Sequence, residues 1–81
     1  MKSVYSIKDL TDLADAIRQR LIDTGYNVIL HKNFVLGKYG FIFEFVGGKK
    51  YITGYDSKDI CMKKLIDINS HVDEIAVEYC V

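Results

Sequence analysis

The stretch YGFIFEFVGGKKYITGYD, residues 39–56, decides the fold because it predicts two strands joined by a tight turn. Aromatic and β-branched residues, which favour strands, stand on both sides of Gly47-Gly48. A glycine pair suits a two-residue hairpin turn, because both central positions of such a turn take positive φ. With that turn, Phe43 pairs with Ile52 and the register of the whole hairpin follows.

Alternation along the two strands then sorts their side chains onto two faces. The first face is almost pure hydrocarbon and is expected to build the core; it carries Phe41, Phe43, Phe45 and Ile52. The second face is mixed, with hydroxyls and charges; it carries Ile42, Glu44, Val46, Lys49, Tyr51, Thr53 and Tyr55. A slip of one residue at the turn would exchange the faces of the second strand, burying Tyr51 and exposing Ile52.

Amphipathic helices are predicted on both sides of the hairpin. The first runs over residues 6–24, with Ser6 as N-cap, Asp9 as its capping-box partner and Gly25 after the last turn. Its apolar stripe is Ile7, Leu10, Leu13, Ala14, Ile17 and Leu21. The second begins at Asp56 or Ser57 and ends near residues 69–71. Its inner stripe is Cys61, Leu65, Ile68 and Val72.

Two more strands complete the predicted order. Residues 26–32 read as a strand with apolar groups on both faces, followed by a loop at 33–38. Residues 74–81 alternate between apolar and polar, which indicates a half-buried last strand. We therefore expect one α+β domain over residues 1–81, a two-layer sandwich of order α-β-β-β-α-β. Its sheet is mainly antiparallel and both helices cover the phenylalanine face. The last strand can lie beside the first strand or beside the third.

Composition narrows the class of protein. The 81 residues hold 11 basic and 11 acidic side chains, so there is no basic surplus of the kind that nucleic-acid binders carry. There is no long apolar span, no signal-peptide pattern, and only two cysteines, too few for a disulfide scaffold. These features predict a cytoplasmic protein with reduced thiols.

The residues that could carry chemistry are few and scattered. His31 and His71 have no metal-ligand spacing, and no glycine motif for phosphate opens a helix. Cys61 belongs to a buried stripe and is expected to be inert, whereas Cys80 is expected on the outer face without a partner base. We predict no enzyme, no catalytic residue, no metal and no cofactor.

The predicted function is that of a small non-enzymatic protein-binding module. Tyrosine is enriched at interfaces, although aromatic residues also stabilise strand pairing on a solvated sheet face, and the sequence favours neither role over the other. The predicted contact residues are Ile42, Glu44, Lys49, Lys50, Tyr51, Thr53 and Tyr55. A homodimer through an edge strand is also expected. The Lys- and Ile-rich, Pro-free composition suits one concrete version, an inhibitor of a host defence protein encoded by a phage or mobile element.

The alternative is a nucleic-acid-binding domain that uses the same tyrosines with Lys49 and Lys50. Lysines at a hairpin tip also keep sheet edges from aggregating, which accounts for them without a ligand. The predicted order resembles that of double-stranded-RNA-binding domains, which place a lysine cluster at the start of their second helix. Here that position reads Asp56-Ser57-Lys58-Asp59, whose carboxylates repel phosphate.

Overall fold

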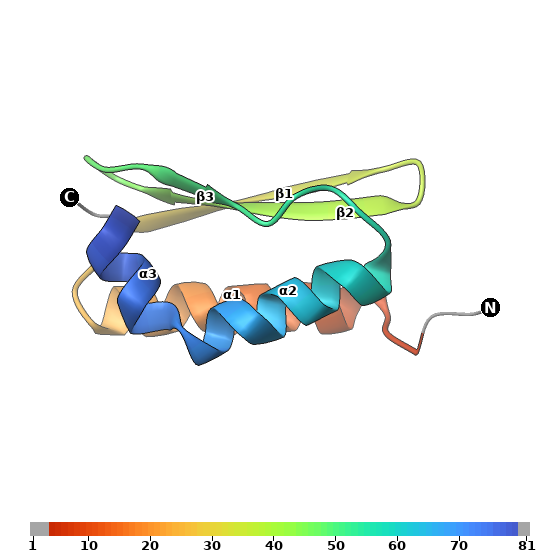
Figure 1. Cartoon of the computed structure of the whole chain (residues 1–81), viewed down its shortest axis with the longest axis horizontal. Coiled ribbons are helices and arrows are strands. Elements are labelled where there is room, and N and C mark those ends of the chain that lie inside the picture. Colours follow the sequence, from red (N-terminus) through yellow and green to blue (C-terminus); the bar gives the residue numbers. More distant parts are fainter. Residues whose placement is uncertain (1–3, 80–81) are drawn as a thin grey trace.

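In the computed structural model, which describes residues 4–79, a three-stranded antiparallel sheet lies over a layer of helices (Figure 1). The elements are α1 (Ile7–Asp23), β1 (Val28–Val35), β2 (Lys38–Phe45), β3 (Lys50–Ile52), α2 (Lys58–Ser70) and α3 (Val72–Tyr79). The helices pack on one face of the sheet, so the predicted two-layer α+β class is confirmed. The predicted last strand is wrong, because a third helix takes its place.

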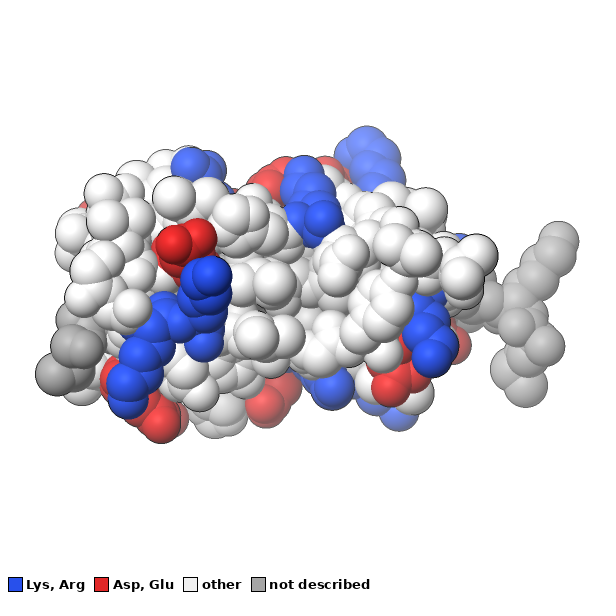
Figure 2. All heavy atoms as spheres, turned by 90° about the horizontal axis from the view of Figure 1, so that it is seen from above, with Lys and Arg blue, Asp and Glu red and all other residues white. Residues whose placement is uncertain are grey.

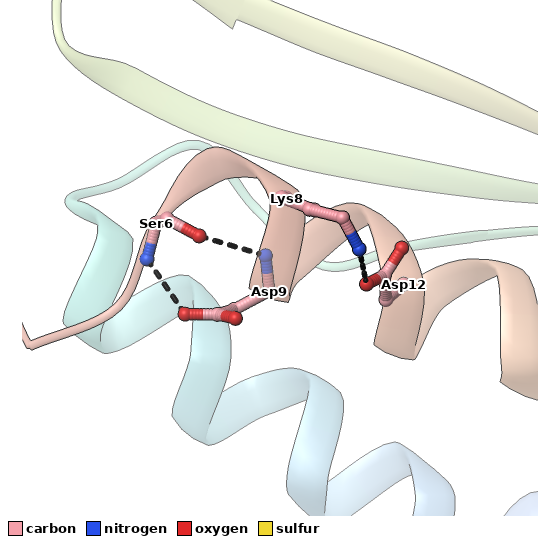
Figure 3. Close-up of polar contacts among 4 residues, drawn as sticks. All are labelled: Ser6, Lys8, Asp9 and Asp12. Carbon is pink, nitrogen blue, oxygen red and sulfur yellow. Dashed lines mark hydrogen bonds and ion pairs between the residues drawn. The ribbon is translucent and has the colours of Figure 1, made fainter.

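The start of α1 is fixed by the predicted capping box (Figure 3). The backbone N–H of Asp9 donates to the Ser6 hydroxyl at 3.1 Å, and the Ser6 N–H donates to the Asp9 carboxylate at 2.8 Å. Lys8 and Asp12 form an ion pair of 2.7 Å one turn further on. The helix ends where Gly25 takes a φ of 106°. Its buried residues, all from the predicted stripe, are Leu10, Ala14, Ile17 and Leu21.

The predicted loop at residues 33–38 is wrong, because β1 and β2 continue to Val35 and Lys38, which pair with each other. Only Leu36 and Gly37 form the turn, with φ values of 52° and 74°. Positive φ at both central positions is the signature of the two-residue turn that matches strand twist. The turn was not predicted because leucine stands at the first of these positions, where asparagine or glycine is normal.

The predicted register of the second hairpin is also wrong, by one residue. Phe43 pairs with Tyr51 rather than with Ile52. The N–H of Phe45 donates to the carbonyl of Lys49, so residues 46–48 form a three-residue connection in place of the predicted two-residue turn. The faces of β3 are therefore exchanged relative to the prediction.

A bulge follows directly after β3 and shifts the pairing back. The N–H of Thr53 donates to the carbonyl of Phe41, whereas Asp56 exchanges two backbone hydrogen bonds with Tyr39. Residues 54 and 55 thus oppose a single residue of β2, which is the pattern of a β-bulge. The bulge restores the register that a two-residue turn would have given.

Helix α3 replaces the predicted strand because its apolar residues also fit a helical repeat. Val72 and Ala76 are buried, and Ile75 and Tyr79 pack against the core. These four positions lie on one side of a helix, whereas alternation would also have required Val77 to point inward. Val77 is 65% exposed. The part of the predicted strand at Cys80 and Val81 lies outside the described residues.

The core lies between the helices and the phenylalanine face of the sheet, as predicted. Phe41, Phe43 and Phe45 are at most 1% exposed. A hollow of about 10 Å³ remains in this layer, too small for a ligand. It is lined by Ile17, Leu21, Phe43, Phe45, Tyr51, Ile68, Val72 and Ile75. The helix-covered side of the sheet is thus filled by packing, which leaves the opposite side as the place to look for function.

Candidate functional site: the open face of the sheet

The side of the sheet turned away from the helices is called here the open face. Strand pairing and alternation assign its side chains. They are Ile29, His31, Asn33 and Val35 from β1, Lys38, Gly40, Ile42 and Glu44 from β2, and Lys50 and Ile52 from β3. Seen from above, this side is broadly uncharged, with separate charged groups set into it (Figure 2).

The middle of the open face is apolar. Ile42 on the central strand lies between His31 on β1 and Ile52 on β3. Ile29 lies one pair further along β1, diagonal to Ile42 and within side-chain reach of it. Ile52 is 62% exposed and Ile29 is 45% exposed. Three adjacent strands therefore each contribute an isoleucine to the open face, and Ile42 and Ile52 are direct cross-strand neighbours.

A polar pair crosses the open face between Ile29 and Ile42. The His31 Nε2 and Glu44 Oε1 atoms lie 2.8 Å apart across β1 and β2. Glu44 also pairs with Lys50 on β3. The hydrogen bond from His31, with a smaller contribution from the charge of Lys50, lowers the pKa of the Glu44 carboxyl. Glu44 is thus held as a carboxylate on a face that is otherwise largely apolar.

Tyr55 crosses the other half of the open face. Its hydroxyl donates to the carbonyl of Val35 at 2.7 Å, and one ring edge passes beside Gly40. A Cβ on Gly40 would overlap the carbonyl oxygen of Gly54, whose φ of 94° belongs to the bulge. Gly40 therefore has no room for a side chain, and the tyrosine ring covers it instead.

The structure brings four of the predicted contact residues to the open face and removes two. Ile42, Glu44 and Tyr55 lie there, as expected, and Tyr55 returns to that side through the bulge. Lys50, expected at the hairpin tip, lies there because of the register shift. Tyr51 and Thr53 lie on the core side, which corrects the prediction. The physical reason is the three-residue turn, which exchanges the faces of β3.

Tyr51 and Thr53 have structural roles in their actual places. The Tyr51 ring lies edge-on to Tyr79, with centroids 5.0 Å apart. Burial, followed by the nearby Tyr79, raises the pKa of the Tyr51 hydroxyl. Thr53 is 4% exposed, and its hydroxyl accepts a hydrogen bond from the N–H of Phe41. Neither side chain lies on the open face.

Lys49, the remaining predicted contact residue, lies in the connection before β3. Its side chain is exposed, and its backbone N–H donates to the carbonyl of Tyr79 at 2.8 Å. That bond ties the hairpin to the end of α3. Lys49 and Lys50 thus sit at one end of the open face, beside Glu44 rather than in a patch of their own.

Three residues of the site were missed by reasoning from the sequence: Ile29, His31 and Ile52. Ile52 was assigned to the core because of the turn length. The alternation of residues 26–32 did place Ile29 and His31 on one face, but both faces of that strand carry apolar groups. Only the pairing of β1 with β2 shows that this is the face of Ile42.

The residues that could carry chemistry remain apart in the described chain. Cys61 is buried, and burial raises the pKa of its thiol. His71 lies between Asp67 and Glu74, at 3.6 and 3.7 Å. Among residues 4–79, no three His, Cys, Asp or Glu side chains form a group that could hold a metal ion. Cys80, predicted as an outer-face thiol, lies outside the described residues.

Comparison with known proteins does not assign this chain to a family. None of the helices within residues 4–79 has the length and apolar character needed to cross a bilayer. No protein-family model matches the sequence, and neither curated proteins nor solved structures give a significant match.

Proposed function

We propose that this protein is a non-enzymatic binding module that holds another protein chain against its open face. One observation carries the proposal: Ile42 and Ile52 oppose each other as an apolar centre of the open face, with Ile29 across the His31–Glu44 pair and with Glu44 and Lys50 at the rim. An apolar centre with a polar rim is the usual anatomy of a protein interface. Exposed apolar residues that stand singly, such as Val77, need no such explanation.

The competing explanation is that these residues only stabilise strand pairing. Cross-strand contact between β-branched residues contributes roughly 0.2–1 kcal/mol per pair, so each isoleucine has some value without a partner. Pairing, however, is satisfied by threonine or valine as well as by isoleucine. The two explanations differ in what a polar substitution does to binding when the fold is retained.

The test replaces Ile29 and Ile52 together by serine. The control is Val77→Ser, which removes an apolar side chain from α3, away from the open face, at an exposure of 65% that is close to the 62% of Ile52. Each tagged protein is used to capture partners from the cells that produce it, and captured proteins are quantified by mass spectrometry. We expect a partner that the wild type and the control retain and the double variant loses. Equal capture by all three proteins, with unchanged circular dichroism, would contradict the proposal.

The alternative of nucleic-acid binding has one observation in its favour: the first five elements follow the α-β-β-β-α order of double-stranded-RNA-binding domains. At the start of α2, however, Lys58 lies over the Tyr39 ring at 5.9 Å, between Asp56 and Asp59. Binding to short DNA and RNA duplexes and single strands at two salt concentrations separates the functions. Affinity that falls steeply with salt would favour the alternative.

The sequence also predicts an inhibitor encoded by a phage or mobile element, a cytoplasmic location and a homodimer through an edge strand. Partner capture from the native cell is also the measurement that tests the first of these predictions.

A further inference from the structure

We infer that the chain held against the open face is a second copy of this protein, packed face to face about a two-fold axis that crosses β2 at Phe41. This inference rests on the proposed function and names its partner. The axis lies between the two sheets and runs across the strands, so each strand lies over its own counterpart in the opposite direction. The arrangement is isologous: each surface element meets its complement on the same patch.

The charges on β2 carry this inference. Lys38 and Glu44 both lie on the open face, and each is three residues from Phe41, or about 10 Å along the strand. A reversal about Phe41 therefore brings Lys38 of each copy over Glu44 of the other. Packed sheets lie about 10 Å apart, a gap that an extended lysine and a glutamate side chain span together. Two opposite-charge pairs form, one on each side of the axis.

The apolar side chains match under the same axis. On the central strand, Ile42 comes over Gly40 of the second copy, where the Tyr55 ring covers the backbone, so an apolar side chain meets an aromatic ring. On β1, Ile29 comes over Val35 of the second copy, because these residues are equally far from Lys32, the pairing partner of Phe41. These two residues are 45% and 51% exposed. One symmetry operation thus pairs the apolar groups as well as the charges.

Other self-associations fit the same surface less well. If the two-fold axis ran along the strands, Lys38 would face Lys38 and Glu44 would face Glu44, which is repulsive. Pairing through the outer edge of β1 would leave the open face uncovered. It would also bring Lys32 of the two copies close together; this lysine lies on the edge strand beside Asp15, at 3.8 Å.

The test is a charge exchange on the central strand. Lys38→Glu and Glu44→Lys are prepared as separate proteins, with Lys63→Glu on the exposed side of α2 as the charge control. The oligomeric state of each is measured by sedimentation velocity over a range of concentrations at neutral pH. Thermal unfolding followed by circular dichroism confirms that each variant is folded.

We expect a dimer for the wild type and for Lys63→Glu. Each exchange variant has two like-charge pairs in place of two opposite ones, so we expect dissociation constants weaker by roughly thirtyfold. Mixing the two exchange variants restores both opposite-charge pairs, and we expect a one-to-one heterodimer. Weaker self-association of each variant together with recovery on mixing distinguishes this arrangement from an axis along the strands, because that axis already places like charges together in the wild type.

Two results would overturn the inference. One is a wild type that stays monomeric at roughly millimolar concentration, a range in which even weak specific contacts are populated. The other is a dimer that neither exchange weakens, because it would use a different surface. In either case, loss of a captured partner in the Ile29→Ser, Ile52→Ser protein would still uphold the proposed function, with a different chain on the open face.

Discussion

Leu36 has a backbone conformation that is unfavourable for leucine. It is 96% exposed and adopts a φ of 52°, a left-handed conformation that asparagine and glycine tolerate far better than leucine. Such strain costs of the order of 1 kcal/mol, and no described contact of the side chain repays it. The residue is therefore suboptimal for the stability of the isolated chain.

We expect Leu36→Asn to raise the free energy of unfolding by about 1 kcal/mol, because it relieves the left-handed strain. Leu36→Val should lower it by a similar amount, because a β-branched side chain fits positive φ worse. Urea unfolding at a concentration where sedimentation shows monomer measures both. If asparagine destabilises the chain, the turn has a different backbone from the one described.

At the scale of the element, α3 is the place where two periodicities compete. Residues 72–79 satisfy a strand pattern through Ile75, Val77 and Tyr79, and a helix pattern through residues 72, 75, 76 and 79. The helix prevails where Ala76 packs against the core with no exposed surface. Tyr79 then reaches both Phe45 and Tyr51 with its ring.

Aspartate at two neighbouring positions separates the two structures. Ala76→Asp buries an unpaired carboxylate, so we expect a loss of about 3 kcal/mol or more. Val77→Asp places the same group in solvent and should change stability by less than about 0.5 kcal/mol. Chemical denaturation gives both values, and the reverse order would indicate the strand.

The sequence predicted a helix or a strand correctly where the apolar residues fitted only one periodicity. The stripe and capping box of α1 and the alternating phenylalanines of β2 leave no second reading, and both predictions are confirmed. Turn lengths could not be read, because Leu36 stands where asparagine or glycine is normal and because residues 46–49 admit connections of different length. The error in turn length placed Tyr51, Thr53 and Ile52 on the wrong face in the prediction. Ile42, Glu44 and Tyr55 lie on the expected face.

At the scale of the whole molecule, all helices share one core with one side of the sheet. Cys61 lies within that core at 1% exposure, so its thiol reports on opening of the entire layer. Because burial raises its pKa, the protonated thiol is favoured in the folded state. Its contribution to stability is complete below the pKa of the unfolded thiol and is lost as the pH rises through the folded value.

A Cys80→Ser protein, in which Cys61 is the only remaining thiol, tests this cooperativity. We expect negligible reaction with a chromogenic disulfide reagent in native buffer, and complete reaction in denaturant. At intermediate denaturant the labelling rate should follow global unfolding monitored by circular dichroism. Rapid labelling of a protein with a native spectrum would show that α2 opens by itself.

The connection before β3 and the bulge after it have opposite effects on the strand register. The connection advances the ladder by one residue, and the bulge at residues 54 and 55 sets it back. Only the short segment between them is inverted, with Ile52 facing outward and Tyr51 facing the helices. Both registers span residues 46–55 with the same number of residues, so the geometry of the turn selects which side chains lie on the open face. A two-residue turn at Gly47-Gly48 without the bulge would use the same residues in a continuous ladder, with Tyr51 on the open face and Ile52 facing the helices.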